Sequence, residues 1–227
     1  MCRFIETICV IDGEPLAIDA HRARVRRTLR ACWGGAAGHR VDSAARGVLE
    51  QALAAALNDG PKAGPNAGAT RTKLRLVYRV PPENHGEPPA VEELELLSYR
   101  VPPINTLRVV DGGEITYSLK YHDRRALHRL YELRDGCDDV LIVRDGLLTD
   151  SSYCNIALCD AGRCVTPATP LLAGTRRARL LQAGRLETAD ISVQSIERYS
   201  HVALFNAMID LGELVLPITA LRPFSIS

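Results

Sequence analysis

The sequence predicts an α+β protein of two domains, a small N-terminal α/β domain and a larger C-terminal domain that is mostly β with helices. In the first part of the chain, strand-like runs flank two amphipathic helical segments. The second part consists mainly of short β-branched runs separated by tight-turn signals. A proline-stiffened crossing, "YRVPPINTL" (Tyr99 to Leu107), separates the two parts. We therefore expect domains at residues 1–104 and 105–227.

The length and composition are those of an ordinary globular protein, of a size common among enzymes. The chain has 227 residues, 46% of them hydrophobic, which is enough for a substantial core. The formal net charge is +1 with both signs interspersed, which argues against nucleic acid as a partner. No apolar run reaches the length of a membrane span, and the N-terminus does not resemble a signal peptide. We expect a cytoplasmic protein without a membrane partner.

The cysteines predict neither a disulfide framework nor a metal site. There are seven, an odd number, and none forms a C-x-x-C pair. Reduced, mostly buried thiols are therefore expected. One alternative stays open, because Cys159 and Cys164 flank the turn "DAGR" and could face each other across a hairpin.

The N-terminal elements follow from turn and helix signals. "FIETICVIDGEPLAI" has two β-branched runs around Asp12-Gly13, which predicts a tight hairpin. Asp19 is expected to cap a helix over "AHRARVRRTLRACW", and a second amphipathic helix is expected from Ser43. Gly60–Thr70 is expected to form a flexible connection, and "TKLRLVYRV" and "AVEELELLSYRV" are expected to form strands.

The C-terminal elements are mostly hairpins. "DRRALHRLYELRDG" is expected to form a helix closed by Gly136, and "DDVLIVRDGLLTDSS" two strands around an Asp-Gly turn. "YCNIALCDAGRCVTPA" predicts a further hairpin, and "AGTRRARLLQAG" a short helix that opens after Gly174. "HVALFNAMIDLGELVLPI" predicts one or two buried strands with a turn.

Lys120 is unusual because this chain rarely uses lysine. Of 28 basic residues only Lys62, Lys73 and Lys120 are lysines. A lysine amine can lose its proton and attack a carbonyl, whereas a guanidinium stays charged. Lys120 is therefore a candidate nucleophile, and the alternative is a surface lysine ahead of a helix.

Six stretches in the same order resemble the fold-type IV enzymes that use pyridoxal 5'-phosphate (PLP), the class IV aminotransferase family. These stretches are "FIETICVIDGEPL", "AHRARV", the segment around Lys120, "DGLLTDSSYCNIAL", "TPATPLLAGTRRARLL" and "FNAMIDLGELVLPI". The family includes branched-chain and D-amino-acid aminotransferases and aminodeoxychorismate lyase. The resemblance spans nearly the whole chain, and it implies a two-domain fold, bound PLP, a small-molecule amino acid, keto acid or aminodeoxychorismate as substrate, and a homodimer.

The resemblance assigns the ends of the cofactor to particular residues. PLP carries an aldehyde, a pyridine nitrogen and a phosphate. Lys120 would form the Schiff base with the aldehyde and then move the α-proton. Asp150 stands where the family has a glutamate beside the pyridine nitrogen, although an aspartate serving a turn is the alternative. Asn155 is expected among the cofactor-binding residues, with a role in supporting the backbone nearby.

The phosphate is expected at the start of the helix that follows Gly174. Gly174 would allow a close approach, and Thr175 would donate its hydroxyl. His21-Arg22-Ala23-Arg24 matches the family's H-x-x-R, which makes Arg24 the expected phosphate arginine. Spacing alone does not separate Arg24 from its neighbours Arg22, Arg26, Arg27 and Arg30. Asn206, in "FNAM", would also contact the phosphate.

Other positions depart from the family pattern and bear on the reaction. Arg125 replaces a tyrosine that contacts the ring hydroxyl in aminotransferases, and Tyr121 or His122 could substitute for it. Thr7 resembles the threonine that assists proton transfer in the lyases. Together with Asn206, Thr7 favours an aminodeoxychorismate-lyase-like reaction that gives 4-aminobenzoate and pyruvate. An amino-acid aminotransferase of the branched-chain or D-amino-acid type and a non-catalytic PLP-binding relative are the alternatives.

Overall fold

The computed structural model describes residues 2–34, 38–59 and 71–223, which form two compact units. One unit comprises Met1–Arg100 with Leu119–Asp123, and the other comprises Val101–Ser118 with Arg124–Ser227. The segment that carries Lys120 is thus grouped with the first unit, whereas the sequence assigned it to the C-terminal domain. The connection expected at Gly60–Thr70 lies outside the described residues.

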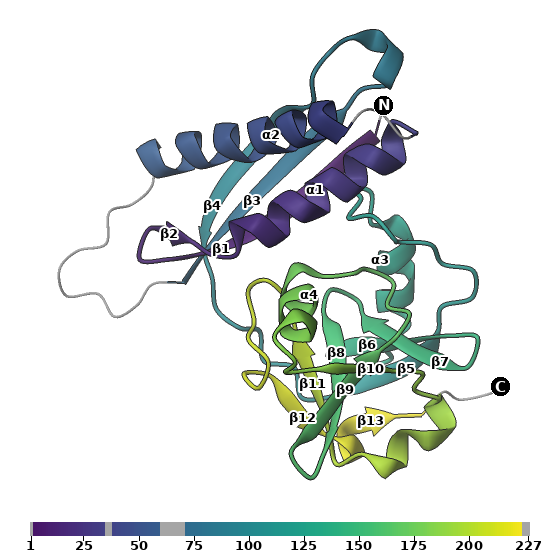
Figure 1. Ribbon diagram of the computed structural model, residues 1–227. Helices are drawn as coiled ribbons and strands as arrows, with labels where there is room; N and C mark the ends of the chain where they lie inside the picture. Colours follow the sequence, from purple (N-terminus) through teal and green to yellow (C-terminus); the bar gives the residue numbers. More distant parts are fainter. Residues whose placement is uncertain (1, 35–37, 60–70, 224–227) are drawn as a thin grey trace. The chain divides into compact units, whose positions relative to one another are not determined.

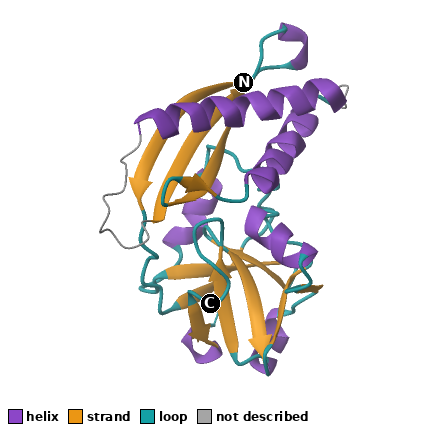
Figure 2. Ribbon diagram, turned by 60° about the vertical axis from the view of Figure 1, so that its left-hand side comes forward, coloured by secondary structure: helices purple, strands orange, loops and turns teal. Residues whose placement is uncertain are grey.

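The first unit is an antiparallel sheet with two helices on one face (Figures 1 and 2). Its strand order is β2-β1-β3-β4, and β1 pairs with β3 along its whole length. The mixed α+β class predicted from the sequence is confirmed. The elements are β1 (Cys2–Ile11), β2 (Glu14–Pro15), α1 (Ile18–Cys32), α2 (Gly38–Asp59), β3 (Arg71–Val80), a 3-10 turn (Glu83–His85) and β4 (Ala90–Ser98).

The core of this unit lies between the sheet and the helices. Alternate side chains of a strand point to one face of the sheet, and on β1 and β3 one such set packs against apolar residues of α1 and α2. The set comprises Phe4, Ile8, Val10, Leu74, Leu76, Tyr78 and Val80. By the same alternation Glu6 faces the helices from the middle of β1, and it is fully buried.

Both helices start at places that the sequence signals did not indicate. Helix α1 begins at Ile18, after Ala17 in the left-handed conformation (φ 59°), so the expectation that Asp19 caps the helix is wrong. Asp19 lies in the first turn and pairs with Arg22 at 3.0 Å. The N–H of Leu16 bonds to Cys9 O at 2.8 Å, which holds the chain against β1 until just before the helix. Helix α2 begins at Gly38, ahead of the expected Ser43.

The second unit is built on a mixed sheet with short helices (Figure 1). The main strand order is β10-β9-β8-β7-β6-β5-β13, and β8 also pairs with β11, which pairs with β12. The strands are β5 (Leu107–Asp111), β6 (Asp139–Arg144), β7 (Leu147–Ser151), β8 (Asn155–Asp160), β9 (Arg163–Pro167), β10 (Glu187–Ala189), β11 (His201–Phe205), β12 (Val215–Pro217) and β13 (Leu221–Arg222). The helices are α3 (Arg125–Glu132) and α4 (Thr175–Gln182), with 3-10 turns at Val193–Arg198 and Ile218–Ala220.

The hairpins of this unit confirm the turn predictions. Asp145 and Gly146 connect β6 to β7 with φ of 53° and 76°, the left-handed values that a two-residue hairpin turn needs.

Helix α3 ends at Glu132, before Gly136, so the expectation that Gly136 closes this helix is wrong. Gly136 has a φ of 76° in the loop that leads to β6.

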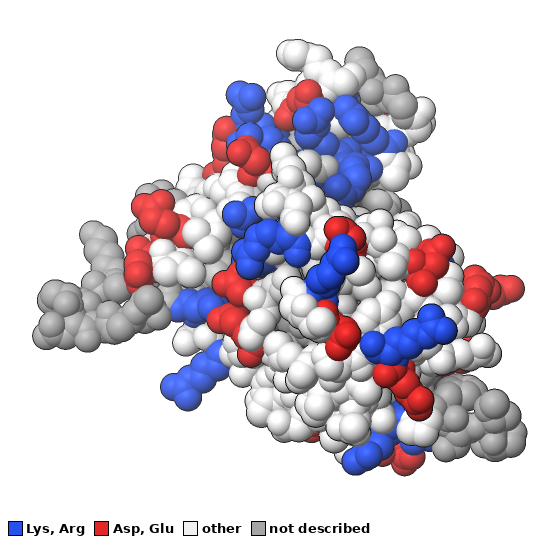
Figure 3. Space-filling model, turned by 60° about the horizontal axis from the view of Figure 1, so that its bottom comes forward, with Lys and Arg blue, Asp and Glu red and all other residues white. Residues whose placement is uncertain are grey.

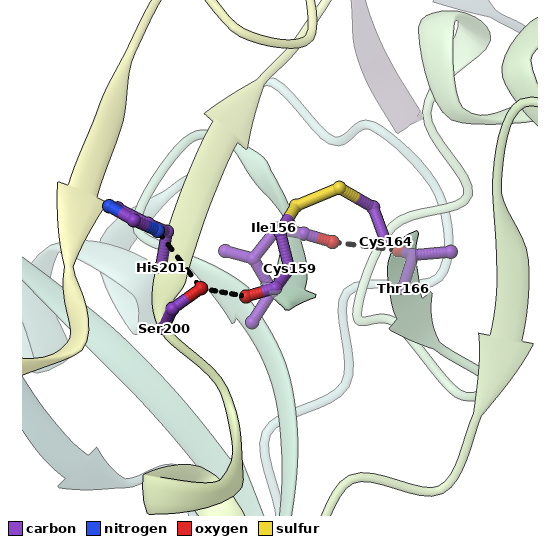
Figure 4. The surroundings of a disulfide bond; sticks show 6 residues. All are labelled: Ile156, Cys159, Cys164, Thr166, Ser200 and His201. Carbon is purple, nitrogen blue, oxygen red and sulfur yellow. Dashed lines mark hydrogen bonds between the residues drawn. A yellow bond between two sulfur atoms is a disulfide. The ribbon is translucent and has the colours of Figure 1, made fainter. Parts of the chain in front are cut away.

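A disulfide joins β8 to β9, which corrects the expectation of reduced thiols at these two positions. The register pairs Cys159 with Cys164 across the turn, and their sulfurs are bonded (Figure 4). Hydrogen bonds support the strands around it: Thr166 Oγ1 donates to Ile156 O at 2.8 Å, and Ser200 Oγ donates to Cys159 O at 2.9 Å.

Charges of both signs are interspersed on the face drawn in Figure 3, in keeping with the small net charge. Ion pairs such as Arg3 with Glu93 and Arg75 with Glu95 join charges of opposite sign on the first unit. Within the described ranges, no helix combines the length and the apolar character that crossing a bilayer requires.

Candidate active site

The turn between β7 and β8 places Asp150 and Asn155 opposite each other. The two residues are cross-strand partners. Ser151 N–H donates to Cys154 O at 2.9 Å, and Cys154 N–H donates to the Ser151 hydroxyl at 3.0 Å, which closes the turn between them. Directly paired residues project on the same side of a sheet. The order Asp-Ser-Ser-Tyr-Cys-Asn therefore brings the two polar side chains together.

The Asp150 carboxylate is buried and accepts a hydrogen bond on each oxygen. Asn155 Nδ2 donates to Oδ1 at 2.7 Å, and the backbone N–H of Leu172 donates to Oδ2 at 2.9 Å. Burial raises the pKa of Asp150 to about 7, although these donors and the positive charge of Arg177 act in the opposite direction. Asp150 can therefore change its protonation state near neutral pH. A positively charged group placed beside it would favour the ionised form.

Helix α4 begins next to this pair. Gly174 precedes the helix, and its carbonyl accepts the first helical hydrogen bond, from Ala178 N–H at 3.0 Å. Thr175, the first helical residue, is buried. A Cβ on Gly174 would overlap Oδ1 of Asn155, so the side chain of Asn155 fills the space beside this glycine. The first N–H groups of a helix have no partner within the helix and favour anions. The phosphate contacts of Gly174 and Thr175 stay a prediction.

Asn206 organises the turn that follows β11. Its Oδ1 accepts from the N–H groups of Met208 and Ile209 at 2.8 and 3.1 Å. Its Nδ2 donates to Sγ of Cys154 at 3.2 Å, which connects this turn to the residue before Asn155. Arg176 of α4 holds the turn as well, because its Nε donates to Asn206 O at 3.1 Å. A phosphate contact by Asn206 stays a prediction.

Sequence reasoning missed Arg177 in the first turn of α4. Arg177 is 8% exposed, and its Nη2 donates to Pro167 O at 2.7 Å. Burial lowers its own pKa, and its charge lowers the pKa of Asp150. Nothing in "GTRRAR" distinguishes Arg177 from Arg176, because only the direction in which α4 packs decides which of the two is buried.

The first unit contains a buried polar cluster, formed by Glu6 of β1 with His21 and Arg24 of α1. Arg24 Nε donates to Glu6 Oε1 at 2.7 Å and Arg24 Nη2 to Oε2 at 2.5 Å, while His21 Nδ1 lies 2.6 Å from Oε2. Burial alone would raise the pKa of Glu6, but the Arg24 charge and the hydrogen bonds from His21 and Arg24 lower it to about 2. Glu6 is therefore ionised, and His21 donates its Nδ1 proton to it.

The candidate arginine Arg24 belongs to this cluster, whereas Glu6 and His21 were missed. Arg24 is 5% exposed and is the buried arginine of α1. A signal for Glu6 was present, because a charged residue at the centre of the apolar run "FIETICV" needs a partner. The three-residue spacing of His21 and Arg24 puts both on one face of α1. The role of Arg24 toward a phosphate stays a prediction.

Lys120 lies in a segment that is hydrogen-bonded to β1. Ile5 N–H donates to Lys120 O at 2.9 Å, and His122 N–H donates to Arg3 O at 2.9 Å. Lys120 is half-buried. Burial is the main cause that lowers the pKa of His21, and the charge of Lys120 lowers it further.

The remaining predicted positions lie around the same strand. Thr7 is half-buried, pairs with Arg75 of β3, and by alternation faces away from the side of β1 that carries Glu6. Tyr121 packs its ring against Phe4 with centroids 5.2 Å apart. Its role as a substitute for the missing tyrosine stays a prediction.

The structure thus gathers the predicted site residues in two groups. The second unit holds Asp150, Asn155, Gly174, Thr175 and Asn206. The first unit holds Lys120, Thr7 and Arg24.

Comparison with known proteins identifies the family. The profile of the family described as amino-transferase class IV matches residues 3–220. An uncharacterized protein from Haemophilus influenzae is 27% identical over 208 residues, which cover 92% of this chain and 98% of that protein.

Solved structures are also similar to this chain. A protein from Haemophilus somnus 129PT, provisionally described as a 4-amino-4-deoxychorismate lyase, has a TM-score of 0.74 and 25% identity, and the match covers 93% of this chain and 98% of that one. The PLP-bound form of a hypothetical aminotransferase from Mycobacterium tuberculosis has a TM-score of 0.69 and 18% identity, and the match covers 97% and 81% of the two chains. At that identity, the second match shows the fold alone.

Proposed function

Because this chain belongs to the class IV aminotransferase family, whose members use PLP, we propose that it is a PLP-dependent enzyme with Lys120 as the lysine that binds the aldehyde. The observation that carries the proposal is the Asp150 carboxyl, which is buried, hydrogen-bonded on both oxygens and adjacent to the start of α4. When bound, PLP supplies an electron-withdrawing ring that stabilises negative charge on the substrate.

The residues around Asp150 fit the ring of PLP. A carboxyl whose pKa is raised to about 7 by burial ionises readily when a protonated ring nitrogen lies beside it. A carboxylate can accept more hydrogen bonds than the two that Asn155 and Leu172 supply. Asp150 would therefore keep the ring nitrogen protonated.

The phosphate would be held by the start of α4 and by Arg24. Gly174 and Thr175 supply backbone N–H groups and a hydroxyl at the positive end of the helix dipole. Arg24 would contribute its positive charge to the phosphate, as the match of His21-Arg22-Ala23-Arg24 to the family's H-x-x-R implies. Asn206 would support this end of the site through its turn.

We further propose that the reaction is aminodeoxychorismate-lyase-like. The H. somnus protein described as such a lyase covers nearly the whole chain, and Thr7 and Asn206 resemble residues of the lyases. In this reaction the proton on the amine-bearing ring carbon is removed and the bond to the enolpyruvyl oxygen breaks. The ring becomes aromatic as 4-aminobenzoate, and the released enolpyruvate takes up a proton to become pyruvate. Lys120 would remove the proton, and the Thr7 hydroxyl would assist its transfer.

Trapping on Lys120 tests the cofactor. Protein incubated with PLP should develop absorbance near the violet edge of the visible range, and borohydride should attach the cofactor to the peptide that contains Lys120. Lys120→Ala should abolish both signals. Lys73→Ala, which removes a lysine of β3, should leave both unchanged. Colourless wild-type protein with no adduct on Lys120 contradicts the PLP proposal.

Product analysis tests the reaction. Incubation with aminodeoxychorismate should release 4-aminobenzoate and pyruvate in equal amounts, and Thr7→Val should slow the release. Amino-group exchange between amino acids and keto acids, without 4-aminobenzoate, assigns the protein to the aminotransferases instead. Bound PLP with neither activity indicates a non-catalytic relative.

A homodimer is part of the proposal, because the resemblance to the family implies one. Sedimentation at micromolar concentration should give twice the mass of one chain, which is 24.8 kDa for the monomer. A monomeric mass contradicts this part of the proposal without affecting the others.

A further inference from the structure

The side chain of Asn155 is fixed in one orientation by its neighbours. Its Nδ2 lies 2.7 Å from Asp150 Oδ1 and 2.8 Å from Leu172 O. The carbonyl is an acceptor, and so is the ionised carboxylate, so the amide must present its NH2 group to them, and each of its two hydrogens has a partner. Asn155 is 6% exposed, so water does not compete for these bonds.

The same contacts fix the Asp150 carboxylate. Leu172 donates its backbone N–H to Oδ2 at 2.9 Å and accepts from Asn155 through its carbonyl. We call the Asn155 side chain and the peptide groups of Leu172 the Asp150 clamp.

Gly174 belongs to the same arrangement. A Cβ at this position would overlap Asn155 Oδ1 and would lie 3.3 Å from its Cγ. The amide could move away only by giving up its hydrogen bonds to Asp150 or Leu172. Asn155 therefore packs between the carboxylate and the residue before α4, and it leaves no room for a side chain at position 174.

We propose that Asn155 is a positioning residue: as part of the Asp150 clamp, it aims the Asp150 carboxylate at the ring nitrogen of the cofactor. The position of its side chain also requires glycine at position 174. This inference rests on the proposed function. Asn155 itself need not touch the cofactor, and its effect should be confined to the contact between the ring nitrogen and Asp150.

The test compares the affinities of three ligands. PLP, its carbocyclic analogue with CH in place of the ring nitrogen, and pyridoxal, which lacks the phosphate, are titrated by absorbance or protein fluorescence. The ratio of affinities for PLP and the carbocyclic analogue reports the contact to the ring nitrogen. The ratio for PLP and pyridoxal reports the phosphate contacts.

Asn155→Ala should reduce the ring-nitrogen ratio by about tenfold, because a hydrogen bond that supports a charged group is lost. The ratio of affinities for PLP and pyridoxal should stay within about twofold of the wild-type value, which corresponds to a small difference in binding free energy. Thr166→Val is the matched control, because Thr166 is buried and its hydroxyl donates to Ile156 O, next to Asn155 in β8. It should lower the melting temperature and leave both ratios unchanged.

The outcomes separate this inference from the proposed function. If wild-type protein binds PLP but Asn155→Ala lowers only the melting temperature and keeps the ring-nitrogen ratio, Asn155 is a structural residue and the inference is overturned. If wild-type protein binds none of the three ligands, the proposed function fails first.

A double-mutant cycle tests the requirement for glycine in the protein without cofactor. Gly174→Ala should lower the melting temperature, and the loss should be largely absent when Asn155→Ala is already present, because the overlapping atom is gone. An equal loss in both backgrounds overturns the link between the two positions. If Gly174→Ala alone does not fold, recovery of folding in the double variant supports the link, and failure of the double variant to fold overturns it.

Discussion

Glu6 shows how a single residue can be held in a core that is otherwise apolar. It faces the helices between Phe4 and Ile8, where an uncompensated charge would be very unfavourable. Its two bonds to Arg24 and its contact with His21 satisfy the carboxylate. Glu6 and Arg24 therefore depend on each other, because removal of either leaves a buried charge without its partner.

We predict that Glu6→Gln lowers the free energy of unfolding by on the order of 3–5 kcal/mol, because the buried guanidinium of Arg24 loses its counter-charge. Glu93→Gln, which removes an exposed carboxylate paired with Arg3, is the matched control and should have a much smaller effect. Denaturant unfolding of both variants measures the difference. Equal losses of unfolding free energy in the two variants contradict the view that burial makes the Glu6–Arg24 pair important for stability.

Asp150 predicts a specific pH dependence in the protein without cofactor. The pKa of the carboxyl is 3.8 in the unfolded chain, and burial raises the pKa to about 7 in the folded protein. Between these values the unfolded chain loses its proton first, so wild-type stability falls as the pH rises. Above about pH 7 both states are ionised and the loss is complete.

Relative to Asp150→Asn, wild-type protein should therefore lose on the order of 4 kcal/mol between pH 4 and pH 7, with no further change above. The difference between the two unfolding curves isolates Asp150 from groups such as Glu6, whose lowered pKa acts in the opposite direction. A difference that does not vary with pH contradicts the assignment.

At single positions, the sequence predicts features that depend on neighbouring residues better than contacts between residues that are distant in the chain. The H-x-x-R pattern identified Arg24 among several arginines, and burial distinguishes the same residue. Its partner Glu6 is distant in the chain, so no local pattern shows the pair. The spacing of Asp150 and Asn155 was visible, but their contact depends on the turn between β7 and β8.

At the scale of elements, tight hairpins were the most predictable feature. Asp12-Gly13 and Asp145-Gly146 carry the residues that tolerate left-handed φ, and both form the turns that the sequence indicates. The start of α1 was less predictable, because Asp19 has the chemistry of a cap but Ala17 occupies the position. Contacts between Leu16 and β1 outweigh the local preference there.

The turn between β8 and β9 carries an alanine where its geometry favours another residue. Ala161 has a φ of 46°, and Gly162 follows with a φ of 79°. A left-handed conformation costs alanine roughly 1–2 kcal/mol, and less for asparagine. We predict that Ala161→Asn raises the free energy of unfolding by about 0.5–1 kcal/mol.

Thermal or denaturant unfolding checks this prediction. Asp145→Ala is the converse control, because it places alanine at the equivalent position of the β6–β7 turn (φ 53°) and should destabilise. Should Ala161→Asn be neutral while Asp145→Ala destabilises, the cost at Ala161 is already relieved by the surrounding hairpin.

At the scale of the whole molecule, the order of elements and the α+β class followed from local signals. The place of the Lys120 segment did not, because Tyr121 forms a bridge to Phe4 from a distant part of the chain. No hydrophobic periodicity or turn signal encodes such a pairing. The resemblance to a family indicates which residues form the site, but it does not indicate which strand the Lys120 segment pairs with. The disulfide was left open for a related reason, since it depends on the register of two strands.

Cofactor binding should change the stability of the whole protein, because a ligand that binds only the folded state stabilises it by mass action. At about 100 times its dissociation constant, PLP should add about 2.7 kcal/mol, and the melting temperature should rise with PLP concentration. Lys120→Ala should show a smaller rise at each concentration, because it loses the covalent link but keeps Asp150 and Thr175. Lys73→Ala should match the wild type. Calorimetry at several PLP concentrations measures these shifts, and a rise in Lys120→Ala equal to that of the wild type contradicts the role of Lys120, since non-covalent contacts would then account for all of the binding.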